Sequence, residues 1–210
     1  MNKKYLYLGG IFGPIVFLIN DIVGSIITPG YSQIVNAVSE LTQRGAEHSV
    51  LLSSLFLIAA VGLVLFAIGI VLQYNFGKSK LLFFGGIFIG LLGIFSAITG
   101  TIFPMDPFGE AATFPGEMHK NLTYINIILV VLGILLIGIG LNKQKKWKLF
   151  LIYSIVVVLI MGTFGALTSV LIMNNIELLG LFERITIYGY QSWTLILSVS
   201  FIREEPKVII

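Results

Sequence analysis

Six long apolar runs dominate this sequence and leave it few possible folds. They cover residues 5–28, 50–74, 81–103, 121–142, 148–173 and 180–202. About 20 apolar residues in a helix cross a hydrocarbon core, and only helices or closed barrels satisfy the backbone there. Only 11% of the 210 residues are charged, whereas soluble domains carry about 25%. We therefore predict an all-α fold: one integral membrane domain over residues 1–210, a polytopic bundle of six transmembrane helices.

The basic residues predict how this bundle is oriented. The run 5–28 exceeds the 7–15-residue core of a cleaved signal peptide, so we expect it to be retained as a span. Three cations fall on one side of the six spans: Arg44, Lys120 and Arg184. Ten fall on the other: Lys3, Lys4, Lys78, Lys80, Lys143, Lys145, Lys146, Lys148, Arg203 and Lys207. Because cytoplasmic loops carry the excess of Lys and Arg, we predict cytoplasmic termini and a multi-pass protein of the cell (plasma) membrane.

Two pairs of spans share a sequence pattern. The tetrapeptide GGIF occurs at residues 9–12 and again at 85–88, an offset of 76. In the following spans the offset is 71, which aligns His48 with His119 and Gly62 with Gly133. This self-similarity predicts a tandem repeat in which the hairpin of spans one and two is followed by a copy made of spans three and four.

Two charged residues lie inside the apolar runs and need partners. Asp21 precedes Pro29 by eight residues, about 12 Å along a helix, and Arg184 lies near the start of the sixth run. Charged side chains in a membrane usually face the bundle interior and pair, so we expect Arg184 to pair with Asp21 or Asp106. A protonated Asp21 bonded to a neighbouring helix, or an Arg184 that reaches the headgroups, are the alternatives.

Polar residues gather in the two outward loops. The stretch FPMDPFGEAATFPGEMHK, residues 103–120, contains Asp106 and His119. The earlier loop contains SELTQRGAEHS, in which we expect a short interfacial helix capped by Ser39. Glu40 and Arg44 are four residues apart and are expected to pair on that helix.

The polar and basic residues also indicate whether a metal, another cofactor or a nucleic acid is expected to bind. The two histidines with Asp106 or Glu40 could chemically hold zinc, but the sequence has neither an HxxxH nor an HExxH pair. We therefore expect no metal, and the motifs present indicate no other cofactor. Membrane topology accounts for the basic loop NKQKKWK, so nucleic acid is not expected as a partner.

Three blocks of the chain resemble a known family. PGYS followed by SELTQRGAEHS, TIFPMDP leading to His119, and GLFERITIY with Trp193 are similar to the signature blocks of the bacterial and archaeal six-span family labelled domain of unknown function 998. The resemblance implies a polytopic membrane protein with these blocks gathered on the outer side, and it carries no established activity. The positions that match those blocks are Ser39, Glu40, Asp106, His119, Glu183 and Arg184.

These observations lead to one main functional expectation and two alternatives. We expect an outward-facing polar pocket that binds a lipid headgroup or a small amphiphile, since guanidinium and imidazole groups suit phosphate or carboxylate. The expected ligand-binding residues are Asp21, Ser39, Glu40, Asp106, His119, Glu183 and Arg184. The first alternative is a membrane-embedded hydrolase or transferase acting on outer-leaflet lipid, with His119 as general base. The second is a transporter, which the crowding of polar residues on one side disfavours.

Overall fold

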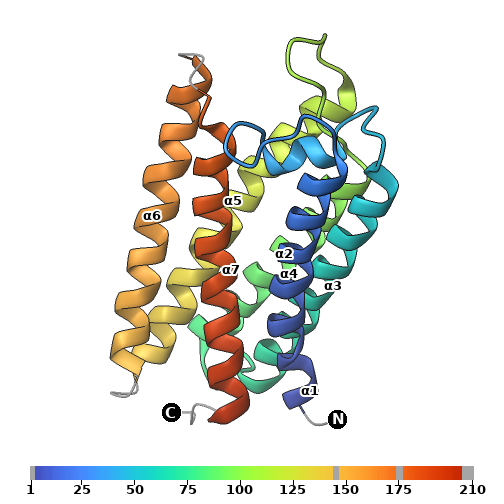
Figure 1. The fold of residues 1–210 in the computed structure, drawn as a ribbon. Helices are drawn as coiled ribbons and strands as arrows, with labels where there is room; N and C mark the ends of the chain where they lie inside the picture. Colours follow the sequence, from blue (N-terminus) through green and yellow to red (C-terminus); the bar gives the residue numbers. More distant parts are fainter. Residues whose placement is uncertain (1–2, 144–146, 174–176, 205–210) are drawn as a thin grey trace.

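The chain is an all-helical bundle, which confirms the predicted fold class (Figure 1). The computed structural model describes residues 3–143, 147–173 and 177–204, and within these ranges it contains no strand. The expected positions Lys145, Lys146 and Lys207 lie outside the described residues. The helices are α1 (Lys4–Tyr7), α2 (Gly9–Ile27), the 3-10 helix η1 (Val38–Thr42), α3 (Ser49–Gln73), α4 (Lys80–Thr101), α5 (Phe114–Asn142), α6 (Lys148–Met173) and α7 (Leu179–Arg203).

Five of these segments are long and apolar enough to cross a membrane. They are Lys4–Ile27, Ser49–Gln73, Lys80–Thr101, Phe114–Asn142 and Lys148–Thr168. Helix α7 has 25 residues but is more polar, because it carries Glu183 and Arg184 as well as several hydroxyl side chains. It nevertheless lies beside the other helices along the bundle (Figure 1), and its crossing of the membrane remains a prediction.

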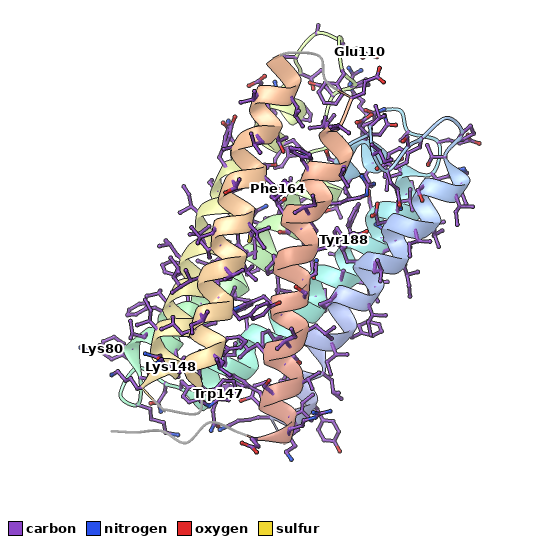
Figure 2. The ribbon with its side chains drawn as sticks, turned by 60° about the vertical axis from the view of Figure 1, so that its left-hand side comes forward. Lys80, Glu110, Trp147, Lys148, Phe164 and Tyr188 are labelled. Atoms are coloured by element: carbon purple, nitrogen blue, oxygen red, sulfur yellow. The ribbon has the colours of Figure 1, made fainter. Side chains whose placement is uncertain are left out.

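Consecutive helices pack against one another, and α7 closes the ring by contacting α2 (Figure 1). Helix α1 and the last turn of α7 lie at one end, which we call the terminal end. The opposite end, which we call the loop end, carries loop 1 (residues 28–48) and loop 3 (residues 102–113). Lys80, Trp147 and Lys148 lie at the terminal end and Glu110 at the loop end (Figure 2).

Close glycine contacts join α2 to α3 and α4 to α5, as expected where packing replaces a hydrophobic driving force. A methyl group on Gly9 would lie only 2.3 Å from the carbonyl oxygen of Gly62. Three contacts of the α2–α3 region recur between α4 and α5 at the offsets found in the sequence: Gly9–Leu65 with Gly85–Leu136, Gly13–Gly62 with Ile89–Gly133, and Leu6–Gly69 with Leu82–Gly140. This agreement supports the predicted repeat.

The tightly packed core lies toward the terminal end. It includes five large aromatic side chains that are at most 1% exposed: Tyr7, Phe66, Tyr74, Trp193 and Phe201. The ring of Tyr7 meets that of Phe201 edge-on, with centroids 5.3 Å apart, and the indole of Trp193 donates to Ser154 Oγ at 2.9 Å.

Candidate functional site at the loop end

Asp21 and Arg184 form a buried ion pair between α2 and α7. Nη2 of Arg184 lies 2.7 Å from Oδ1 of Asp21, and Nε lies 3.0 Å from Oδ2. Asp21 is 0% exposed and Arg184 5%. The pair confirms Asp21 as one of the two partners predicted for Arg184. The predicted alternatives, a pair with Asp106 and an Arg184 side chain that reaches the lipid headgroups, are wrong.

The remaining N–H groups of Arg184 are also used within the chain. Nη2 donates to the hydroxyl of Tyr31 at 2.6 Å, and Nη1 donates to the carbonyls of Gln33 at 2.7 Å and Asn36 at 2.9 Å. A guanidinium has five N–H donors, and each of them has an acceptor here. Arg184 therefore has no donor left for a ligand in this conformation.

Two tyrosines complete the surroundings of the ion pair. The hydroxyl of Tyr188 donates to Oδ2 of Asp21, and the hydroxyl of Tyr31 donates to the carbonyl of Ala37 at 2.8 Å. Burial raises the pKa of Tyr31 far above its ordinary value, so this phenol remains a neutral donor. Both tyrosines were missed by the sequence analysis, although Tyr188 follows Arg184 by one helical turn.

Loop 1 is bonded to the start of α7 along its whole central part. The N–H groups of Gly180 and Leu181 donate to carbonyls of loop 1, at 3.2 Å to Val35 and 2.9 Å to Ile34. These donors have no partner within a helix that is just beginning. The carboxylate of Glu183 accepts the N–H of Val38 at 2.7 Å. Together with Arg184, these contacts fix loop 1 against α7.

The predicted short helix in loop 1 is present as the 3-10 helix η1, with an unexpected cap. Glu40 accepts the N–H of Ala37 at 2.6 Å and the side-chain amide of Asn36 at 2.8 Å. Ser39 does not cap the helix, because its hydroxyl lies 3.2 Å from Sδ of Met105. Glu40 and Ser39 thus stabilise loop 1 and its contact with loop 3.

Asp106 belongs to a second cluster, which joins loop 1 to loop 3. Its carboxylate accepts the backbone and side-chain donors of Thr113, at 2.7 and 2.8 Å, and Nε of Arg44 at 3.1 Å. These bonds, those from Thr113 first, hold the pKa of Asp106 below its usual range. Arg44 also pairs with Glu110 at 2.7 Å, so the predicted pair of Arg44 with Glu40 is wrong.

His119 bonds to the start of loop 3, not to the residues of the buried ion pair. Its Nδ1 is 2.9 Å from the carbonyl oxygen of Phe103. A general base and its nucleophile are expected within hydrogen-bond reach, but Ser39 contacts Met105 instead. No group of three His, Cys, Asp or Glu residues suited to a metal occurs in the part of the chain that the structure describes.

Two asparagines in the loop-end half of the bundle have buried side-chain atoms without hydrogen-bond partners among the described residues. Asn20 is 0% exposed, and neither its Nδ2 nor its Oδ1 has a partner among the described residues. Asn126 on α5 is partly exposed, but its Oδ1 is buried and also has no partner within the described ranges. Buried amides are normally hydrogen-bonded. The sequence could have indicated both asparagines, because each interrupts an apolar run. Of the polar residues in the first run, however, only Asp21 was predicted as a site residue.

Helix α7 is loosely packed in the same half of the bundle. Residues 185–191 are all partly exposed, and together they cover two turns and therefore every face of the helix. A methyl group on Gly189 would find one neighbour within 4 Å, Val157 at 3.9 Å. The loop-end half thus combines unmatched polar atoms with incomplete packing.

Comparison with known proteins identifies a family. Residues 11–200 match the model of a family described as "Protein of unknown function (DUF998)". Neither a curated protein nor a solved structure matches the chain. Since the match covers most of the chain and agrees with the resemblance noted in its polar blocks, this protein is a member of the DUF998 family.

Proposed function

We propose that this protein binds a small amphiphile or a lipid headgroup from the outer leaflet of a prokaryotic plasma membrane. The bound polar group lies within the loop-end half of the bundle, beneath loop 1. In this proposal the termini are cytoplasmic, α7 is the sixth span, and the loop end faces outward, as the distribution of Lys and Arg predicts.

The observation that carries the proposal is the set of unsatisfied side-chain atoms, Nδ2 and Oδ1 of Asn20 and Oδ1 of Asn126. A buried polar atom without a partner costs about 1–3 kcal/mol, so a guest that supplies the missing hydrogen bonds recovers that cost. Asn20 is fully buried, which means that its partner must be enclosed by the chain. The loosely packed outer part of α7, which carries Tyr188, supports room for such an enclosure.

The charged residues have a different role from the one that the sequence suggested. The guanidinium of Arg184 is fully occupied by the chain, and Asp106 is bonded to Thr113 and Arg44. Arg184 and Asp106 therefore act as positioning residues. They hold loop 1 in place as a cover, while the asparagine amides contact the guest.

Mass spectrometry of lipids that co-purify with the protein tests this proposal. Asn20→Leu and Asn126→Leu each remove polar atoms at nearly constant volume, and we expect each to lower retention of the guest severalfold. Neither should lower the melting temperature of the delipidated protein, because each substitution removes an unsatisfied buried group. Thr123→Val, which changes an exposed hydroxyl one turn from Asn126, is the matched control and should retain the guest. Unchanged retention in both asparagine variants would refute the proposal.

A further inference from the structure

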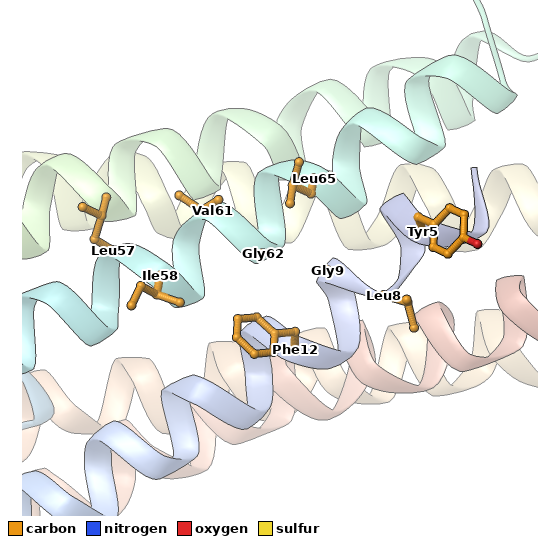
Figure 3. Close-up of a pocket in the computed structure, with 9 residues that line it drawn as sticks. All are labelled: Tyr5, Leu8, Gly9, Phe12, Leu57, Ile58, Val61, Gly62 and Leu65. Atoms are coloured by element: carbon orange, nitrogen blue, oxygen red, sulfur yellow. The ribbon is translucent and has the colours of Figure 1, made fainter. Parts of the chain in front are cut away.

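A groove on the outer face of the bundle lies between the first helices and α3, away from the loop end (Figure 3). Its volume is about 500 Å³, within the range of roughly 300–1,000 Å³ typical of ligand pockets. Nine residues line it: Tyr5, Leu8, Gly9, Phe12, Leu57, Ile58, Val61, Gly62 and Leu65. Apart from the Tyr5 hydroxyl, the lining side chains are apolar.

The groove exists because two of its lining residues have no side chain. Gly9 and Gly62 bring the backbones of α2 and α3 together, and larger side chains stand on both sides of this contact. Those side chains are 40–70% exposed, from Leu65 at the lower limit to Tyr5 at the upper. An apolar channel open along its length fits a flexible hydrocarbon chain.

The length and direction of the groove match one leaflet of a bilayer. Along α3 it extends from Leu57 to Leu65, about 12 Å at 1.5 Å per residue, and one leaflet contributes about 15 Å of hydrocarbon. Tyr5 lies at one end of the groove and Leu57 and Ile58 at the other (Figure 3). Because tyrosine favours the membrane interface, the groove runs from the interface at the terminal end toward the bilayer centre.

Positive charge gathers at the terminal end of the bundle, where the groove opens beside Lys4. Lys4 is exposed and precedes the lining residue Leu8 by one helical turn, which places both on the same helix face. Among the described residues, the cations at the terminal end are Lys3, Lys4, Lys78, Lys80, Lys143, Lys148 and Arg203, whereas Glu204 is the one acid there. Basic clusters next to a membrane attract anionic lipids.

We propose that this groove binds an anionic phospholipid of the leaflet at the terminal end. One acyl chain lies between α2 and α3, and the phosphate-bearing headgroup lies beside Lys4 and Tyr5. The site is separate from the loop-end site in position, leaflet and chemistry, and it does not depend on the function proposed there.

Competition between two lipids with the same acyl chains tests the groove. The purified protein is equilibrated with mixed vesicles of palmitoyl-oleoyl phosphatidylglycerol and phosphatidylcholine, and retained lipid is counted by native mass spectrometry. We expect the wild type to retain the anionic lipid severalfold more. Lys4→Gln should remove this preference, and Val61→Trp, which fills the groove, should reduce retention of both lipids.

Two matched variants separate a specific site from general attraction. Lys148→Gln removes an exposed lysine at the same end, and Leu159→Trp adds an indole to a lipid-facing position of α6 that is 63% exposed. Both should behave as the wild type. Equal retention of the two lipids by the wild type, or losses in these controls as large as in Lys4→Gln and Val61→Trp, would overturn the proposal. The Asn20→Leu and Asn126→Leu variants leave this groove intact, so the two sites fail independently.

Discussion

At the level of single residues, the buried pair of Asp21 and Arg184 has an energetic meaning that differs from that of a surface ion pair. Moving both charges out of water is costly, and their mutual attraction and hydrogen bonds offset that cost only when the geometry is good. Here the contact is bidentate and Tyr31 and Tyr188 add further bonds. Loss of one partner leaves the other charged and buried.

We therefore expect Asp21→Leu and Arg184→Met each to destabilise the protein by about 3–5 kcal/mol. The double variant should lose much less than the sum of the two, because it leaves no unpaired charge. Unfolding of the purified protein in mixed micelles with increasing denaturing detergent measures the coupling. If the stability losses of the two single variants add up in the double variant, Asp21 and Arg184 are not coupled and the expectation is contradicted. The exposed pair of Lys120 and Glu117 is the control, with an expected coupling below about 1 kcal/mol.

The lowered pKa of Asp106 predicts a dependence on pH at the loop end. Because the pKa of Asp106 is lower in the folded chain than in the unfolded one, its stabilising contribution is fully present above the ordinary Asp value of about 4. That contribution is lost as the pH falls through the lower, folded value. The melting temperature of the wild type should therefore fall toward that of Asp106→Asn below about pH 4. Parallel pH curves for the two proteins would contradict this expectation, and Glu110→Gln provides the exposed-carboxylate control.

At the level of elements, the contact between loop 1 and α7 depends on the absence of a side chain at Gly180. A methyl group there would lie 2.2 Å from the carbonyl oxygen of Asn36 and 2.6 Å from that of Gln33. Both are backbone atoms, so loop 1 or the start of α7 would have to move. The first turn of α7 and the cover of the loop-end site are thus parts of one structural unit.

Gly180→Ala should destabilise the protein by about 1–3 kcal/mol, the usual cost of overpacking, and should expose loop 1 to protease. Gly165→Ala is the matched control, since nothing lies within 4 Å of the added methyl group and alanine favours a helix over glycine by about 1 kcal/mol. Melting temperature and the rate of limited proteolysis measure both effects. Equal behaviour of the two variants would show that the close contact at Gly180 is not maintained in solution.

Sequence reasoning succeeded where a single physical cost dominated. The lengths of the apolar runs predicted the helices. The cost of a charge in hydrocarbon predicted that Arg184 pairs with Asp21 or Asp106, and the first of these partners is the one found. It failed for Arg44 and Asp106, because their partners depend on the path of loop 1 and on the fold of loop 3. Helix periodicity says nothing about those paths. Gly180 was missed for the same reason, since only the folded loop makes its close contact visible.

For the whole molecule, packing is uneven along the bundle axis. Aromatic side chains fill the terminal half, whereas the loop-end half contains the buried ion pair, two unsatisfied asparagines and a partly exposed stretch of α7. A tight half next to a loose half favours local opening at the loop end without loss of the fold. The orientation of this axis in the membrane is therefore central to both proposed sites.

Single cysteines can determine that orientation, because the natural chain contains none. Glu110→Cys lies at the loop end and Lys78→Cys lies in the turn between α3 and α4, at the terminal end. We expect a membrane-impermeant maleimide to label Glu110→Cys in intact cells and Lys78→Cys only after permeabilisation. The reverse pattern would invert the orientation and place the loop-end site in the cytoplasm.

The ion pair also has a consequence for the order of events during synthesis. Asp21 is made 163 residues before Arg184, so α2 enters the membrane while its partner has not yet been translated. Until α7 arrives and supplies the guanidinium, the carboxyl group of Asp21 must stay near water. The final helix thus completes the surroundings of the first, and chains truncated before α7 lack the guanidinium that pairs with Asp21.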